Sequence, residues 1–176
     1  ALNKISDLRY GENPHQKSSI YSDQNLGIAN SKLLHGKAMS YLNFLDADAA
    51  FSSANSFSDH TLSIEKHTNP CGLSSTDNQL ESYKNALKGD PISAFGGILI
   101  ANKPIDLETA KEIHSLFCEV VIAPGFSKES LSLLKEKKNR ILLIQKSTDL
   151  PDNTLRSCLN GFLTQNRESR RKCKWF

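Results

Sequence analysis

The stretch GILIANKPIDLETAKEIHSLFCEVVIAPGFSKESLSLLKEKKNRILLIQ, residues 97–145, decides the fold. It contains three short apolar runs, residues 97–101, 120–123 and 141–145, and each run is bounded by polar or turn residues. Short runs rich in branched side chains predict buried strands. The two segments between the runs have the length and periodicity of helices, so the stretch predicts an alternation of strands and helices.

Cap residues and periodic apolar positions predict where the helices lie. Asp106 and Ser127 are the expected N-caps of the two helices in this stretch, because their short side chains can accept hydrogen bonds from the first turn. Upstream, we expect one helix that ends near Asn55 and another that Gly89 closes as a left-handed C-cap. The side chains predicted to face the core are Leu42, Leu45, Ala49, Ala50, Leu80, Tyr83, Leu87, Ala110, Ile113, Phe117, Leu131 and Leu134.

The alternation of strands and helices predicts an α/β fold, with a largely parallel sheet and helices packed on it. Residues 19–21, 62–65 and 161–165 are expected to add further strands. Ligands in such folds tend to bind where strands end and loops begin, so we expect functional residues there.

The composition indicates a soluble globular protein of about one domain. The 176 residues are 38% hydrophobic and 23% charged, which excludes collagen-like, low-complexity and wholly disordered chains. No apolar run approaches the length of a membrane span and no segment resembles a signal peptide, so a membrane partner is not expected. The four cysteines form no CxxC pair, which predicts reduced thiols in the cytoplasm and no zinc site.

The positive charge is concentrated in one segment. Residues 167–176 contain five basic residues and one acid, so the net charge of +3 leaves −1 for all residues before them. The body therefore has no broad basic surface, and nucleic-acid binding is not expected. We interpret the basic segment as a solvated terminus, with contact to RNA or to an acidic surface as the alternative.

The segment KHTNPCG, residues 66–72, directly follows a predicted strand. Asn69 and Pro70 suit the start of a helix or tight turn, and that bend would bring Lys66 and His67 to one site. A neighbouring ammonium favours the neutral imidazole, which can accept a proton, while the ammonium can stabilise a developing oxyanion. The alternative is a surface lysine beside a structural histidine.

Three further clusters offer binding chemistry. In LRYGENPHQ, residues 8–16, Arg9 and Tyr10 combine a guanidinium fork with an aromatic plate, although a plain polar loop also explains them. Gly96, in a glycine pair before a strand, lets the backbone approach a ligand closely, or simply makes a turn. Glu119 precedes a buried-looking strand and can accept hydrogen bonds from an amine or amide, or is an ordinary edge charge.

His67, Pro70 and Cys71 resemble part of the zinc-deaminase signature, which is H-x-E followed by P-C-x-x-C. Asn69 and Ser74 stand where that signature needs its glutamate and its second cysteine. The general acid and one metal ligand are therefore missing, and a metal-free site is predicted.

Six blocks, taken in order, resemble the formyltransferase domain of the bifunctional purine biosynthesis family. That family joins AICAR transformylase to IMP cyclohydrolase, where AICAR is aminoimidazole carboxamide ribonucleotide. The resemblance covers residues 8–165, and six ordered blocks are far more specific than one motif. The blocks are LRYGENPHQ (8–16), LLHGKAMSYLNFLDADAA (33–50), KHTNPCG (66–72), DPISAFGG (90–97), EVVIAPGF (119–126) and KEKKNRILLI (135–144).

The resemblance implies a fold similar to cytidine deaminase but without zinc. It also implies transfer of a formyl group from the cosubstrate 10-formyltetrahydrofolate to the 5-amino group of AICAR. By resemblance, the catalytic histidine falls on His67 and the transition-state-stabilising lysine falls on Lys66. The nucleotide-binding residues that it implies are Arg9, Tyr10, Gly96 and Glu119.

The resemblance also implies an organisation for the chain. Residues 1–166 match the N-terminal half of the formyltransferase domain, so the domain is expected to be truncated, and residues 167–176 form a basic tail without a match. The cyclohydrolase domain is missing, so no residue is assigned to that hydrolase activity. The family implies a cytoplasmic homodimer, and the alternative is a non-catalytic fragment that at most binds the nucleotide.

Overall fold

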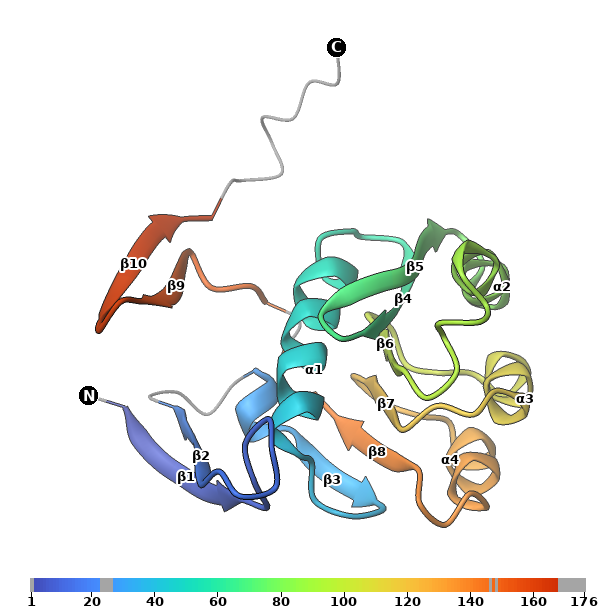
Figure 1. The fold of residues 1–176 in the computed structure, drawn as a ribbon. Helices are drawn as coiled ribbons and strands as arrows, with labels where there is room; N and C mark the ends of the chain where they lie inside the picture. Colours follow the sequence, from blue (N-terminus) through green and yellow to red (C-terminus); the bar gives the residue numbers. More distant parts are fainter. Residues whose placement is uncertain (1, 23–26, 146, 148, 168–176) are drawn as a thin grey trace.

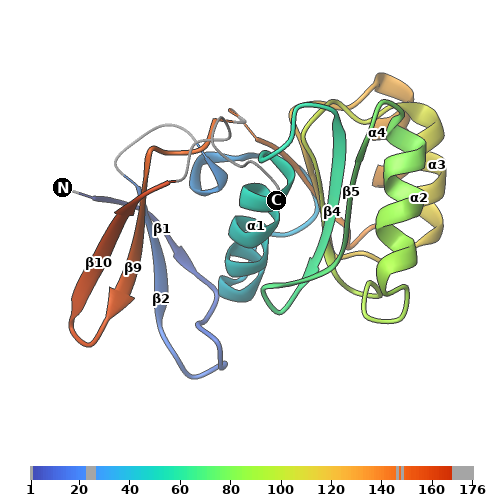
Figure 2. The same cartoon turned by 90° about the horizontal axis from the view of Figure 1, so that it is seen from above.

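The computed structural model describes residues 2–22, 27–145, 147 and 149–167. A six-stranded sheet with helices on both faces forms its body, and two antiparallel ribbons lie to one side (Figures 1 and 2). The predicted α/β class is confirmed, whereas the specific likeness to cytidine deaminase stays a prediction. All of the predicted basic tail except Arg167 lies outside the described residues.

The central sheet mixes parallel and antiparallel strands. Its spatial order is β3 (Lys32–His35), β8 (Ile141–Ile144), β7 (Val120–Ala123), β6 (Ile98–Ala101), β4 (His60–Lys66) and β5 (Asn69–Thr76). Only the β6–β7 and β7–β8 pairings are parallel, and the other three are antiparallel. The expectation of a largely parallel sheet is therefore wrong at both edges. A two-residue turn joins β4 to β5, and so short a turn connects only antiparallel strands.

Among the described residues, four α-helices cover the two faces of this sheet. Helix α1 (Tyr41–Ala54) covers one face, while α2 (Gln79–Gly89), α3 (Leu107–Ser115) and α4 (Lys128–Lys135) cover the other (Figure 2). The predicted caps are confirmed: Asp106 accepts a hydrogen bond from Thr109 N at 2.8 Å, and Ser127 accepts one from Ser130 N at 3.1 Å. A short 3-10 helix, η1 (Ile28–Asn30), precedes β3. Within the described ranges, no helix is long and apolar enough to cross a bilayer.

The sheet separates two apolar layers, because successive side chains of a strand point to opposite faces. The layer under α2, α3 and α4 contains Leu99 and Leu142, neither of which is exposed to solvent. The layer under α1 contains Ile100 and Ile122, packed with the small side chains of that helix. Both faces of the central strands are thus buried, which fixes their register.

Helix α1 lies where the sequence predicts it but presents a different face to the sheet. Leu42 and Leu45, expected inside, are 38% and 37% exposed. The buried positions of the helix are Asn43, Asp46, Ala47, Ala50, Phe51 and Ala54. Alanine side chains let the helix approach the sheet closely, so the larger leucines lie on the outer face.

Two other local predictions are wrong. Gly89 is not left-handed: helix α2 is capped by Asp90, and a Cβ at Gly89 would lie 2.6 Å from the carbonyl oxygen of Cys71. The glycine is therefore required by the close approach of α2 to β5. Phe117 lies beyond the end of α3 and is 53% exposed, with its ring 4.9 Å from that of Phe95.

The two ribbons stand apart from the central sheet (Figure 2). One consists of β1 (Asn3–Leu8) and β2 (Ser18–Ser22), and the other of β9 (Asn153–Cys158) and β10 (Gly161–Asn166). The strands β2 and β10 fall on predicted positions, but β1, β3, β5 and β9 do not. These four carry little apolar alternation, which is the main signal for a strand in a sequence.

Candidate active site

The Lys66–His67 pair lies at the turn between β4 and β5. Lys66 pairs with Asn69 across the hairpin, and the two residues between them, His67 and Thr68, have φ angles of 54° and 59°. Two positive φ angles in a two-residue loop define a type I′ turn. The predicted bend exists as a tight turn, but it is made by His67 and Thr68 and closes at Asn69. The helix given as the other possibility is absent, because Asn69 and Pro70 begin strand β5.

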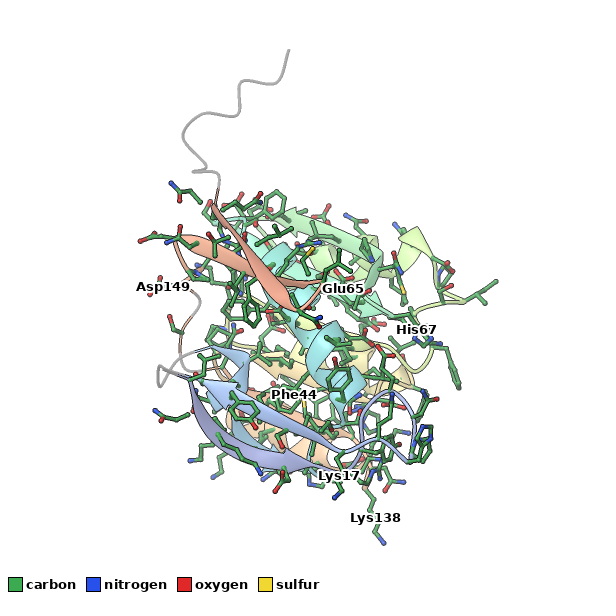
Figure 3. The ribbon with its side chains drawn as sticks, turned by 60° about the vertical axis from the view of Figure 1, so that its left-hand side comes forward. Lys17, Phe44, Glu65, His67, Lys138 and Asp149 are labelled. Carbon is green, nitrogen blue, oxygen red and sulfur yellow. The ribbon has the colours of Figure 1, made fainter. Side chains whose placement is uncertain are left out.

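Hydrogen bonds hold this turn in its strained shape. The amide N of Thr68 donates to Asp46 Oδ1 of helix α1 at 2.7 Å. The carbonyl oxygen of His67 accepts from Thr68 Oγ1 and from Asn69 Nδ2, each at 2.7 Å. The imidazole of His67 forms no hydrogen bond with any described residue, and Figure 3 shows it outside the ribbon, whereas Glu65 lies inside. The ring is therefore accessible to a ligand.

The Lys66 ammonium lies against the loop before β6. Its Nζ donates to the carbonyl oxygen of Phe95 at 2.7 Å. The next residue, Gly96, has a φ of 78° and donates its N–H to Phe117 O at 2.8 Å. A Cβ at Gly96 would lie 3.9 Å from Lys66 Nζ, an ordinary contact distance, so the glycine adjoins the ammonium, and its positive φ is what favours glycine here.

Glu119 joins the same edge of the sheet from the next strand. Its N–H donates to Gly97 O at 3.0 Å, and its side-chain Oε2 accepts from Asn43 Nδ2 at 3.2 Å. The residue is exposed to solvent. The start of β6, the start of β7 and the end of β4 therefore meet at one edge, since β4 runs antiparallel to β6.

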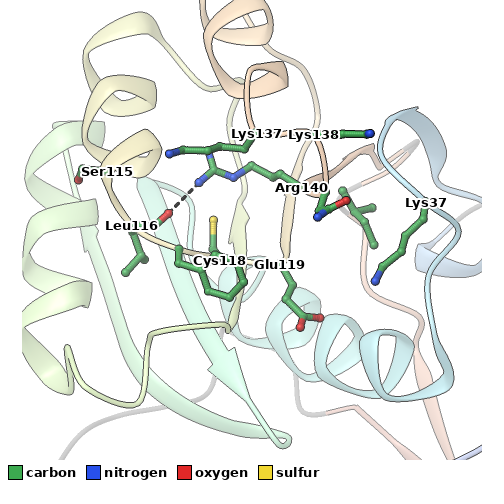
Figure 4. A pocket seen from close by; sticks show the side chains of 11 residues that line it. Lys37, Ser115, Leu116, Cys118, Glu119, Lys137, Lys138 and Arg140 are labelled. Atoms are coloured by element: carbon green, nitrogen blue, oxygen red, sulfur yellow. Dashed lines mark hydrogen bonds between the residues drawn. The ribbon is translucent and has the colours of Figure 1, made fainter.

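Glu119 also lines a cavity of about 490 Å³ between the ends of α3 and α4 and the start of β8 (Figure 4). Four basic residues share this lining: Lys37, Lys137, Lys138 and Arg140. Arg140 is only 3% exposed and donates from Nη2 to Leu116 O at 2.7 Å. Burial raises the pKa of the nearby Cys118 thiol to about 11, against the opposing effect of Arg140, so this thiol is a poor nucleophile at neutral pH.

The Arg9–Tyr10 pair lies in a different element, the loop after β1. The guanidinium of Arg9 lies 4.7 Å from the centre of the Tyr10 ring, and its Nη2 donates to the Tyr10 hydroxyl at 2.9 Å. Arg9 also lines a cavity of about 250 Å³ with Met39 and Phe44, which brings the loop next to the N-terminal turn of α1. The pair thus presents the guanidinium group and the aromatic ring that the sequence predicts for ligand binding.

Comparison with known proteins decides the family. A family model described as the AICARFT/IMPCHase bienzyme matches residues 1–175. The chain belongs to this family. The resemblance stated from the six sequence blocks is therefore confirmed.

Relatives in the AICARFT/IMPCHase family are bifunctional purine biosynthesis proteins named PurH. The Bacteroides thetaiotaomicron protein is 45% identical over 96% of this chain and 32% of its own length. The Dictyostelium discoideum protein is 47% identical over 93% of this chain and 32% of its own, and that of Bacillus cereus strain AH187 is 44% identical over 94% and 34%. The chain thus spans about a third of the length of these relatives.

The structure brings some of the residues predicted for the AICARFT/IMPCHase site together and leaves others apart. Lys66 and Gly96 adjoin each other, and the backbone bond from Glu119 to the glycine pair connects it to them. Within the described ranges, no hydrogen bond or ion pair joins Arg9 or Tyr10 to these three residues. The β1–β2 loop and the β4–β5 turn nevertheless extend toward the same end of the molecule (Figure 2).

Sequence reasoning missed two polar residues of α1, Asn43 and Asp46. Both are at least nine-tenths buried, and each hydrogen-bonds to a segment that carries predicted site residues. A signal was present, because polar residues three positions apart share the face that also carries Ala47 and Ala50. Leu42 and Leu45 obscure that signal, because their large apolar side chains indicate that the other face of the helix is buried.

Glu65 is a buried acid next to the candidate site. It is 1% exposed, its Oε1 accepts from Ser63 Oγ at 2.9 Å, and its Oε2 has no partner among the described residues. Burial raises the pKa of this carboxyl, and the hydrogen bond from Ser63 opposes the rise only in part. A cluster of three or more His, Cys, Asp or Glu side chains able to hold a metal ion is absent from the described part of the chain.

Proposed function

We propose that this chain forms the nucleotide-binding first half of an AICAR formyltransferase site of purine biosynthesis. The observation that carries this proposal is the junction of Lys66, Gly96 and Glu119 at one edge of the sheet, with His67 on the adjoining turn. These four residues come from three separate sequence blocks. Membership in the AICARFT/IMPCHase family supports the choice of reaction.

His67 would act as the general base. The 5-amino group of AICAR is a weak nucleophile, because its lone pair is shared with the ring and the carboxamide. It must lose a proton as it attacks the formyl carbon, and the accessible imidazole of His67 can accept that proton. Base catalysis of this kind contributes roughly 10²- to 10⁴-fold in rate.

Lys66 would stabilise the negative charge that develops on the formyl oxygen. Its ammonium is held at 2.7 Å by the carbonyl oxygen of Phe95, so the charge is already in position before the substrates arrive. The cosubstrate 10-formyltetrahydrofolate supplies the formyl group: as the new bond to the 5-amino nitrogen forms, the bond between N10 and the formyl carbon breaks, N10 takes up a proton and tetrahydrofolate leaves. We assign no folate-binding residue within this chain. A positive charge positioned in this way raises the rate roughly 10²- to 10³-fold.

Four residues would bind the nucleotide. Arg9 and Tyr10 provide a guanidinium and a ring for its charged and planar parts. Gly96 allows the backbone to approach it, and the Glu119 carboxylate can accept hydrogen bonds from its hydroxyl or amino groups. From the family resemblance, we also propose that the protein works as a homodimer in the cytoplasm.

A second function is favoured by one observation, which is that the chain spans 32–34% of its relatives' length. Such a chain would bind AICAR but would not transfer the formyl group, because we assign no folate-binding residue within it. We propose this as the alternative to a competent enzyme.

One experiment separates the two functions. The purified chain is mixed with AICAR and 10-formyltetrahydrofolate, formylated nucleotide is measured by chromatography, and AICAR affinity is measured by calorimetry on the same sample. Turnover that falls at least 100-fold in His67→Ala, with affinity within a few-fold, supports the enzyme. The matched control is His114→Ala, a histidine on the opposite face of the sheet in α3.

Binding without turnover supports the alternative function. Absence of both binding and turnover contradicts both proposals. Near-normal turnover in His67→Ala contradicts the general-base role in particular.

A further inference from the structure

The N-terminal half of helix α1 buries two polar side chains against the sheet. Asn43 and Asp46 are 8% and 9% exposed and lie three residues apart, so they share one face of the helix. Their neighbours on this face, Ala47 and Ala50, are fully buried and small. Burial of a polar group is unfavourable unless it is hydrogen-bonded, which makes the partners of these two side chains informative.

Asp46 holds the turn that carries His67. Its Oδ1 accepts the N–H of Thr68 at 2.7 Å, and a carboxylate acceptor makes this bond stronger than one between neutral groups. Thr68 is β-branched and has a φ of 59°, which is a rare conformation for such a residue. The strained turn therefore depends on an anchor from another element, and helix α1 supplies it.

Asn43 holds the carboxylate of Glu119. Its Oδ1 accepts the N–H of Ser40 at 3.1 Å, as part of the capping box that begins α1. The amide is thereby fixed in one orientation, and its Nδ2 donates to Glu119 Oε2 at 3.2 Å. The start of the helix thus sets the direction of an exposed acid at the start of β7.

We propose that Asn43 and Asp46 are positioning residues, through which helix α1 holds the two parts of the site separately. Asp46 fixes the turn with the base, and Asn43 fixes the carboxylate that receives the nucleotide. This inference rests on the proposed function. It adds that the two residues act on different steps, so their loss has different consequences.

Two substitutions test this with little disturbance of the helix. Asn43→Asp keeps an acceptor for the Ser40 N–H and suits a helix N-terminus, but it removes the donor to Glu119 and adds a like charge. Asp46→Ala removes the acceptor for Thr68, whereas Asp46→Asn keeps an oxygen there and serves as the conservative rescue. Ser127→Ala removes the cap of α4, far from the site, and controls for a general loss of stability.

Hydrogen exchange of the Thr68 amide reports on the turn. We expect exchange to become at least tenfold faster in Asp46→Ala and to stay within about threefold in Asp46→Asn, Asn43→Asp and Ser127→Ala. Calorimetry with AICAR reports on the carboxylate. We expect affinity to fall at least tenfold in Asn43→Asp and to stay within about threefold in Asp46→Ala.

Two further measurements, like the Thr68 exchange, do not depend on nucleotide binding. Exchange of the Asn43 side-chain amide should become at least fivefold faster in Glu119→Ala, because its acceptor is lost. A scalar coupling across the hydrogen bond from Thr68 N to Asp46 Cγ should be present in the unmodified chain, even where Asp46→Ala does not fold.

The outcomes separate this inference from the proposed function. If the unmodified chain does not bind AICAR, the proposed function fails, and the exchange rates and the coupling still decide the positioning roles. Absence of the coupling, or unchanged Thr68 exchange in Asp46→Ala, overturns the role of Asp46. Equal changes of both readouts in both variants, matching those of Ser127→Ala, overturn the inference as a whole.

Discussion

The two faces of the central sheet differ in what they bury near the start of β6 and β7. Strand β4 shows the difference best: Ile64 packs with Leu99 in the layer under α2, α3 and α4, while its neighbour Glu65 points to the α1 side. The first face buries a continuous apolar layer. The second is apolar at its centre but polar at this edge, where Asn43 and Asp46 meet the candidate site. Both faces therefore bury an apolar cluster, and the α1 face in addition holds functional groups in position.

The largest effect is expected on the apolar face, at Gly72. A Cβ at this position would lie 1.8 Å from the carbonyl oxygen of Ala86 in α2, so strand and helix would have to separate. We expect Gly72→Ala to lower the free energy of unfolding by at least about 3 kcal/mol, measured by chemical denaturation. The matched control is Gly125→Ala, where a Cβ would meet only Pro104 at 3.6 Å, and an equally large loss there would contradict this explanation.

The next effect is expected at Ile64, which is not exposed at all. Ile64→Ala removes buried methyl groups and leaves a cavity, so unfolding free energy should fall by about 3 kcal/mol, and Ile64→Val should cost about 1 kcal/mol. Denaturation curves of the two variants check this order. A change of less than about 1 kcal/mol in Ile64→Ala would show that the two faces do not differ as described.

Glu65, one residue further along the strand, is expected to behave in the opposite way. Its pKa is raised by burial, so the folded chain binds more protons than the unfolded chain above about pH 4.5, and its contribution to stability falls as the pH rises. Glu65→Gln should therefore raise the unfolding free energy at pH 7.5 by about 1–2 kcal/mol and flatten its decline between pH 4.5 and 7.5. A variant that is less stable at pH 7.5 would contradict the unfavourable burial of this carboxylate.

The smallest effect is expected at the turn itself. His67 has a φ of 54°, which glycine adopts without the steric cost that other residues incur. His67→Gly should raise the unfolding free energy by about 0.5–1 kcal/mol, while it removes the proposed base. His67→Ala is the control, since it removes the same ring but keeps a Cβ, and it should leave stability within about 0.5 kcal/mol. Equal stability of the two variants would argue against strain in the turn.

The sequence predicts the apolar layers well and the polar edge poorly. The runs at β6, β7 and β8 are continuous and branched, so their places follow from local composition alone. The place of the turn at His67 and Thr68 does not, because positive φ is uncommon for residues other than glycine, and the turn is held by a long-range hydrogen bond that Asp46 accepts from the Thr68 N–H. Pro70 differs from the prediction for the same reason. It lies in strand β5 opposite Glu65 of β4, and this pairing exists only in the folded chain.

The candidate site was predictable to a similar extent. The family blocks indicated Lys66, Gly96 and Glu119, and the fold does bring these residues together at one edge. Asn43 and Asp46 were not found, because the larger apolar side chains of α1 pointed to the wrong face of the helix. Alanines together with polar residues three positions apart are a weak sign of the buried face of a helix. The pattern becomes informative only when the helix is known to pack on a sheet.

The proposed site is tested most directly by mapping backbone amide shifts in the 15N-labelled chain during titration with AICAR. We expect saturable shifts with one common affinity at the six residues of the candidate site, which are Arg9, Tyr10, Lys66, His67, Gly96 and Glu119. Shifts confined to the opposite ends of β6, β7 and β8, or no saturable shift at these six residues, would contradict the proposed binding site.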